Sequence, residues 1–150
     1  KGRGREHVRE AIVTLDNLNK HIVIAGLGRL TVGTLLGGVW ANESWGRYWG
    51  WDPKETWALI TILVYAVVLH FRWIPQMRSL WLNATASMAA VSSVVMTYFG
   101  VNYFLSGLHS YAAGEPMAVP AWVYIGVAIM VGLAGVSGLI DRSREWGKSA

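Results

Sequence analysis

The sequence predicts an all-α protein, a polytopic bundle of four membrane-spanning helices, and three observations lead to this prediction. Of its 150 residues, 53% are hydrophobic and 15% are charged, whereas soluble domains are about a quarter charged. Nine tryptophans and seventeen glycines fit a membrane protein, because Trp gathers at bilayer interfaces and Gly is frequent in spanning helices. Four long apolar stretches follow one another, each close to the about 20 residues that cross a bilayer.

The four predicted spans are residues 22–41, 55–72, 80–104 and 120–140. In the first, Arg29 is the only charged side chain, and it should face the bundle or water because a charge in lipid is costly. The second is the apolar run 57–71, which Thr56 and Glu55 extend to spanning length. The third has no formal charge and is rich in Ala, Ser and Val, which let helices pack closely. The fourth begins at Pro120, which suits a first helical turn because its missing N–H is not needed there.

The basic residues predict how the chain is oriented, because Lys and Arg favour the cytoplasmic side of a membrane. If the four spans alternate in direction, ten cationic residues lie on one side: Lys1, Arg3, Arg5, Arg9, Lys20, Arg72, Arg78, Arg142, Arg144 and Lys148. Only Arg47 and Lys54 lie on the other side. The chain is therefore predicted to be a single membrane domain, with residues 1–20 and 141–150 cytoplasmic and the loops 42–55 and 105–119 external.

Some classes of function are excluded by what the sequence lacks. It contains no cysteine, so disulfides, thiolate metal sites and thiol catalysis are excluded, and the chain cannot hold haem covalently as a c-type cytochrome does. The lipid membrane is a predicted partner of the chain, and binding to a nucleic acid is not expected. The chain opens at Lys1 with neither an initiator Met nor a signal-peptide pattern, which predicts that it is the later part of a longer polypeptide.

A tryptophan-rich loop separates the first two spans: Trp45-Gly46-Arg47-Tyr48-Trp49-Gly50-Trp51-Asp52-Pro53-Lys54-Glu55-Thr56-Trp57. One interpretation is an aromatic belt at the membrane surface, but a belt needs only one or two rings at each helix end. Gly46 and Gly50 let the backbone curve, so that large flat ring faces are expected to collect on one surface. Such a surface suits a planar apolar ligand, and a porphyrin is the leading candidate.

The charged residues of this loop have simpler interpretations beside the ligand-binding ones. Asp52, Pro53 and Glu55 form the pattern of a capping box with proline at the first helical position, so Asp52 is expected chiefly to cap the second helix. Arg47 and Lys54 suit either interfacial anchors or partners of haem propionates, and charge alone does not decide between these roles.

The run from Trp45 to Trp57 resembles the signature of the haem-handling cytochrome c assembly family, named for its WWD loop. The continuation through Leu59 to His70 and Arg72 is most similar to the CcsA/ResC-type synthase branch, rather than to the CcmC-type delivery or CcmF-type lyase branches. The resemblance extends from the first span to the fourth. It implies a holocytochrome c synthase, part of a larger polypeptide or complex, that holds haem b outside the bacterial plasma membrane or in the thylakoid lumen.

The same resemblance implies the reaction and the partners. Haem would be positioned for thioether attachment to the Cys-x-x-Cys-His motif of apocytochrome c, with a CcsB/ResB-type partner that is fused or separate. The alternative is a haem transporter or delivery protein without ligation activity. Two further alternatives are a b-type electron-transfer subunit, which would need buried histidine pairs, and a scaffold subunit with an aromatic belt.

The four histidines differ in what is expected of them. Taken alone, His109 is a loop histidine and His70 an interfacial one, and no role is assigned to His7 or His21. The resemblance implies that His109 is an axial ligand of haem iron and that His70 is a candidate haem ligand within the membrane. The family also has an external histidine ahead of the WWD loop, which this chain lacks. The role of Arg29 stays open between a haem carboxylate and a helix outside this chain. The predicted site residues are His109, Trp45, Trp49, Trp51, Asp52, Trp57, Arg47 and His70.

Overall fold

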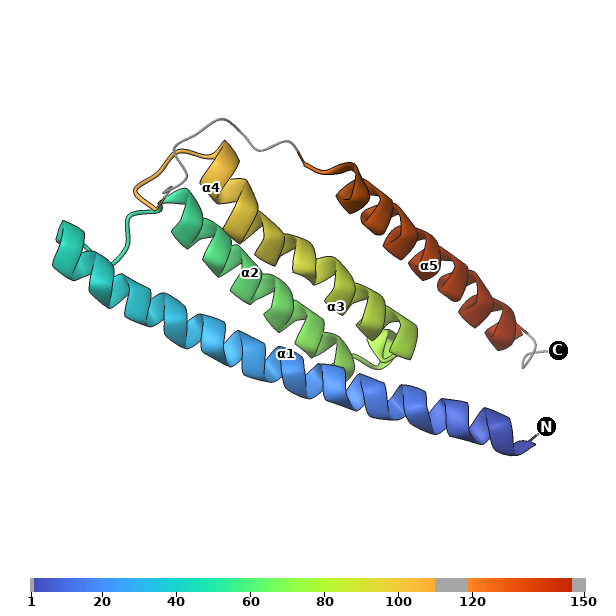
Figure 1. Cartoon of the computed structure of the whole chain (residues 1–150). Coiled ribbons are helices and arrows are strands. Elements are labelled where there is room, and N and C mark those ends of the chain that lie inside the picture. The colour runs from blue at the N-terminus through green and yellow to red at the C-terminus, as the bar shows by residue number, and fades with distance from the viewer. Residues whose placement is uncertain (1, 110–118, 147–150) are drawn as a thin grey trace. The chain divides into compact units, whose positions relative to one another are not determined.

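The computed structural model describes residues 2–109 and 119–146, and every regular element in these ranges is a helix (Figure 1). The predicted all-α class is therefore confirmed. Four helical segments are long and apolar enough to cross a membrane: Glu6–Trp45, Pro53–Trp73, Leu80–Phe104 and Ala121–Asp141. The chain divides into two compact units, and α5 (Ala121–Trp146) is the described helix of the second.

The first helix is longer than the span predicted from hydropathy. α1 (Gly2–Trp45) is one continuous helix of 44 residues, about 66 Å long at 1.5 Å per residue, and residues 22–41 form only its middle part. Nothing between residues 2 and 21 breaks a helix, since the segment lacks proline and is rich in Arg, Glu and Leu. The helix ends where Gly46 adopts a left-handed φ of 70° and its N–H donates to the Asn42 carbonyl at 2.8 Å.

α2 (Pro53–His70) begins at the capping box that the sequence predicted, and that prediction is confirmed. The Asp52 side chain accepts the N–H of Lys54 at 3.3 Å, and the Glu55 carboxylate accepts the N–H of Asp52 at 3.2 Å. Glu55 also accepts the N–H of Gly50 at 2.8 Å, so the capping box holds the preceding loop against the helix start. Two short turns follow, η1 (Phe71–Trp73) and η2 (Pro75–Met77).

The third spanning segment combines three helical pieces: α3 (Leu80–Val95), the π-helical η3 (Met96–Gly100) and α4 (Val101–Phe104). α2 and α3 pack side by side in opposite directions, and α1 packs against both (Figure 1). Small residues permit this approach, since Ala41, Ala90 and Val101 are at most 3% exposed. Most large apolar side chains instead face outward, as expected where lipid is the surrounding solvent.

α5 starts one residue after Pro120, whose carbonyl accepts the Val123 N–H at 3.0 Å. Pro120 therefore precedes the helix, where the sequence suggested a first-turn position. Residues 110–118 of the predicted external loop, and residues 147–150 of the predicted tail, lie outside the described residues.

Candidate functional site

Two segments far apart in the chain meet at the loop end of the first unit, where α1 ends and α2 begins. The Leu108 N–H donates to Asp52 Oδ1 at 2.7 Å. His109 Nδ1 lies 3.0 Å from Asp52 Oδ2. These contacts join residues 56 and 57 positions apart, so His109 lies directly against the tryptophan-rich loop.

The carboxylate at the centre of this contact is nearly inaccessible to solvent, with the Asp52 side chain 6% exposed. Burial alone would raise the pKa of Asp52. Hydrogen bonds from the Leu108 N–H, the His109 ring and the Lys54 N–H outweigh burial, and the pKa of Asp52 is lowered from its ordinary value of 3.8. Asp52 therefore carries its negative charge at neutral pH.

The charge on Asp52 determines which nitrogen of His109 carries the hydrogen. An ionised carboxylate only accepts hydrogen bonds, so Nδ1 of His109 carries the hydrogen of this contact. In the neutral imidazole the lone pair is then on Nε2, the nitrogen turned away from Asp52. The ring is thereby in the tautomer that a metal-ligating histidine adopts when its other nitrogen donates to a carboxylate.

Close approach of the two segments depends on a glycine. A Cβ atom built at Gly107 would collide with the Asp52 carboxylate and lie 2.9 Å from Cδ of Pro53. Any other residue at position 107 would therefore push residues 107–109 away from the start of α2. The sequence signal for this contact was the glycine two residues before His109, which composition alone does not distinguish from an ordinary loop glycine.

The aromatic rings are arranged edge to face. Trp45 meets the His109 ring at a centroid distance of 4.6 Å and an interplanar angle of 88°. The Trp40–Trp45 pair is at 5.1 Å and 79°, and the Trp49–Trp51 pair at 5.7 Å and 88°. The expected single flat surface is therefore not formed by these pairs. The ring quadrupole explains the difference, since it favours perpendicular over coplanar contact.

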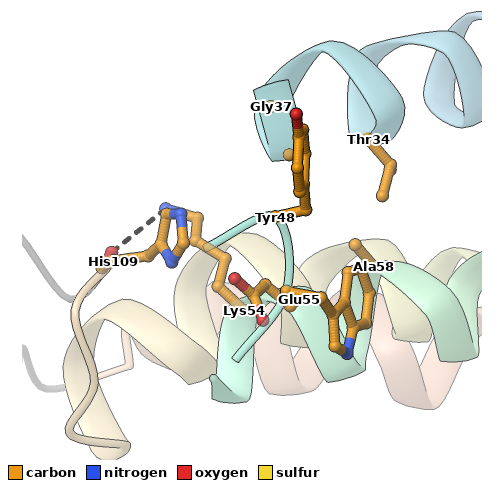
Figure 2. A pocket seen from close by; sticks show the side chains of 9 residues that line it. Thr34, Gly37, Tyr48, Lys54, Glu55, Ala58 and His109 are labelled. Atoms are coloured by element: carbon orange, nitrogen blue, oxygen red, sulfur yellow. Dashed lines mark hydrogen bonds between the residues drawn. The ribbon is translucent and has the colours of Figure 1, made fainter. Parts of the chain in front are cut away.

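A pocket of about 120 Å³ opens beside this cluster (Figure 2). Its walls come from α1, the tryptophan-rich loop, the start of α2 and the residue 109 segment: Thr34, Gly37, Gly38, Tyr48, Trp49, Lys54, Glu55, Ala58 and His109. The pocket is small beside the about 300 to 1,000 Å³ of sites that enclose a drug-sized ligand. The pocket is therefore too small to enclose a ligand of that size.

Lys54 ties α2 to the other segments at the pocket wall. Its Nζ donates to Asn102 Oδ1 at 3.0 Å and to the His109 carbonyl at 3.5 Å, the dashed line in Figure 2. These contacts join α2 to the segments that carry Asn102 and His109, a structural role that is neither of the two left open by the sequence. Asn102 was not anticipated from the sequence, because a lone amide in an apolar span has no motif to mark it.

The remaining predicted residues lie in the tryptophan-rich loop and along α2. Arg47 is exposed, and its guanidinium packs so closely on Gly50 that a Cβ there would lie 2.8 Å from Cζ. Trp51 is 69% exposed and has a left-handed φ of 57°. Trp57 is half-buried in the second turn of α2. His70 is at the opposite end of that helix, about 25 Å away along its axis.

The imidazole of His109 is of a kind that can serve as a ligand to haem iron. Among the described residues, no group of three or more His, Asp or Glu side chains converges on one point. A porphyrin supplies the equatorial nitrogens itself, so a single well-oriented imidazole is a sufficient contribution from this segment.

Comparison with known proteins places the site inside a shared region. Residues 6–109 match the family described as cytochrome C assembly protein. The chain is 52% identical to Protein NrfI of Wolinella succinogenes over 103 residues, 69% of this chain and 11% of that protein. It is 50% identical to the cytochrome c biogenesis protein CcsA of Gloeobacter violaceus over 100 residues, 65% of this chain and 29% of that protein. The CcsA of Guillardia theta is also 50% identical over 101 residues, 65% of this chain and 32% of that protein. The matching part is thus about a third or less of each relative.

Proposed function

The chain belongs to the cytochrome c assembly protein family, and from this premise we propose that its loop end holds haem for covalent attachment to an apocytochrome c. Membership confirms the resemblance predicted from the tryptophan-rich loop and gives the chain a place in cytochrome c biogenesis.

The observation that carries the proposal is the meeting of His109 with the tryptophan-rich loop. An imidazole with its lone pair on Nε2 stands edge-on against Trp45 and shares a pocket wall with Trp49. Haem needs both features, an axial nitrogen for iron and apolar rings beside the macrocycle. An aromatic belt alone does not account for a buried carboxylate that orients a histidine.

Each group then has a defined role. His109 would hold the haem iron through Nε2. Trp45 and Trp49, with Trp51 and Arg47 at the margin, restrict the haem plane and its propionates. Each cysteine thiol of the substrate adds across a haem b vinyl group, with sulfur bonding one carbon and hydrogen the other. Holding the two reactants in place is the contribution of the protein, because orientation alone lowers the barrier to such additions.

The remaining predictions extend this function beyond the loop end. The loop end is proposed to face outward from the bacterial plasma membrane, or into the thylakoid lumen. A CcsB/ResB-type partner, fused or separate, would complete the site. His70, at the other end of α2, is the candidate ligand on the path by which haem enters from the cytoplasmic side, and Trp57 lies on the helix between.

A haem delivery protein without ligation activity is the alternative. The two are separated by incubating the purified full-length, haem-loaded protein with an apocytochrome peptide carrying Cys-x-x-Cys-His. A synthase yields a covalent adduct that survives acid extraction of haem, whereas a delivery protein releases haem without one.

Haem binding by His109 is tested by replacing it in the full-length protein with glycine. We expect His109→Gly to lower the amount of haem that copurifies and to remove one axial imidazole from its absorption spectrum, and added imidazole to restore both. His21→Gly is the matched control, since His21 is an exposed histidine of α1. Unchanged haem content and spectrum in His109→Gly would overturn the proposal.

A further inference from the structure

Asp52 makes more contacts than a helix cap requires. As a cap it accepts the Lys54 N–H on Oδ2. It also accepts the Leu108 N–H on Oδ1 and meets His109 Nδ1, and neither of these groups belongs to α2. A serine or asparagine caps a helix about as well as an aspartate. Capping therefore explains neither the charge of Asp52 nor its contacts to the second segment.

Ser79 shows what capping alone looks like in the same unit. Its hydroxyl accepts the Leu82 N–H at 2.9 Å and so caps α3. That cap carries no charge. Asp52, by contrast, is a carboxylate only 6% exposed, and burying a charge is costly unless it is paired and hydrogen-bonded. The contacts with residues 108 and 109 offset this cost. The negative charge of Asp52 is therefore explained by its pairing with the histidine rather than by capping.

The imidazole is held in three ways. Nδ1 is bonded to Asp52, the plane of Trp45 stands perpendicular to the ring, and the neighbouring Leu108 N–H fixes the carboxylate itself. Because Gly107 has no Cβ, the segment lies close enough for all three. The direction of Nε2 is consequently set by groups on both segments.

We propose that Asp52 is the positioning residue for His109, orienting Nε2 and making it a stronger electron donor, so that Asp52 lowers the reduction potential of the haem this histidine binds. The inference rests on the proposed function, because it takes His109 as a haem ligand. A histidine that donates its other N–H to a carboxylate is a more basic ligand, and a more basic ligand favours the ferric state.

The first test is Asp52→Asn in the full-length protein, which keeps the size of the side chain and an oxygen for the cap. We expect the midpoint potential of the bound haem to rise and haem affinity to fall about 10- to 100-fold, the usual effect of losing such a partner. Ser79→Ala is the matched control. It removes the N-terminal cap of α3, next to the turn between α2 and α3, and should leave the midpoint potential of the haem unchanged.

The second test asks whether Asp52 acts through the N–H. In His109→Gly, imidazole offers an N–H to Asp52 whereas 1-methylimidazole cannot. We expect imidazole to restore haem binding at about one tenth of the concentration that 1-methylimidazole requires. We also expect the midpoint potential of the bound haem to be lower with imidazole than with 1-methylimidazole. The difference should disappear when Asp52→Asn is added.

The outcomes separate the two proposals. If His109→Gly keeps its haem and spectrum, the proposed function fails. If His109→Gly loses haem but Asp52→Asn leaves the potential unchanged, or the two imidazoles act equally, then His109 is a ligand and Asp52 is only a cap. A raised potential together with an imidazole preference that depends on Asp52 supports the positioning role.

Discussion

The two ends of the helical unit formed by α1, α2 and α3 each carry a histidine, and the two are held in different ways. At the loop end, His109 Nδ1 meets the Asp52 carboxylate 57 residues away in sequence, and its side chain is 17% exposed. The turn end is the opposite end, where α2 is followed by the turns η1 and η2. There, His70 Nδ1 lies 2.6 Å from the carbonyl of Ala66 in its own helix, and the side chain is exposed. One histidine is oriented by tertiary structure and the other by its own helix.

A third histidine, His21, makes the same kind of contact within its own helix as His70 does. His21 Nδ1 lies 2.7 Å from the Asn17 carbonyl, also four residues earlier in a helix. This contact is what an exposed helical histidine adopts locally, so it does not distinguish His70 from a residue without a role. His70 also meets Trp73 edge to face, with the ring centroids 4.7 Å apart, and among the described residues His21 has no such ring contact. Among the described residues, His109 is the histidine whose imidazole is contacted by groups distant in sequence, Asp52 and Trp45.

The turn end is instead organised by an ion pair. Arg72 donates to both carboxylate oxygens of Asp16 at 2.7 and 2.8 Å, and the two side chains are 20% and 14% exposed. Asn19 adds a hydrogen bond from α1 to Ser87 of α3 at 3.0 Å. These contacts fix α1 against the turn after α2. One end therefore orients a histidine through distant residues, and the other is held by an ion pair.

The sharpest way to break this comparison is Gly107→Val. We expect it to displace residues 107–109 from Asp52, to destabilise the loop end by about 1 to 3 kcal/mol as overpacking does, and to abolish most haem binding in the full-length protein. Haem content and the absorption spectrum of the purified protein are the measurements. Gly28→Ala is the matched control, because a Cβ at that position of α1 meets nothing within 4 Å. Full haem content in Gly107→Val would show that the approach of the two segments is dispensable.

Arg72→Ala, at the turn end, should lower stability without affecting haem binding. Loss of the paired hydrogen bonds to Asp16 is expected to lower the free energy of unfolding by roughly 1.5 to 3 kcal/mol, the range for hydrogen bonds to charged groups. The spectrum of haem bound at His109 should not change. Chemical denaturation of the full-length protein in detergent measures the free energy of unfolding. Arg9→Ala, at an exposed arginine, is the control. A changed spectrum with unchanged stability would mean that the two ends are not separable in this way.

The contrast between the ends also explains what could be predicted from the sequence. The spans depend on runs of about 20 consecutive residues and the Asp52 capping box on residues within one helical turn, so composition and spacing were sufficient. The contact of Asp52 with His109 depends on how α2 and the segment after α4 pack, and a capping role already seemed to account for the carboxylate. The edge-to-face rings were missed for the same reason, since counting aromatic residues does not reveal interplanar angles. The extension of α1 to Gly2 was missed because hydropathy marks where a helix is apolar and not where it ends.

The smallest expected effect concerns pH at the loop end and follows from the lowered pKa of Asp52. In the unfolded chain this carboxyl titrates near its ordinary value of 3.8, and in the folded protein it does so at lower pH. Its contribution to stability should therefore be fully present above pH 3.8 and be lost as the pH falls through the lower folded-state value.

The measurement is the difference in unfolding free energy between the wild-type protein and Asp52→Asn across a pH series. We expect that difference to be constant from neutral pH down to about pH 4 and to shrink below it, because protonation removes from the wild-type the charge that the variant lacks throughout. The Arg72→Ala and Asp16→Ala variants provide the turn-end comparison. If the difference instead grew on acidification, the folded protein would disfavour the ionised form of Asp52 relative to the unfolded chain. The hydrogen bonds from Leu108 and His109 would then not be what holds the loop end together.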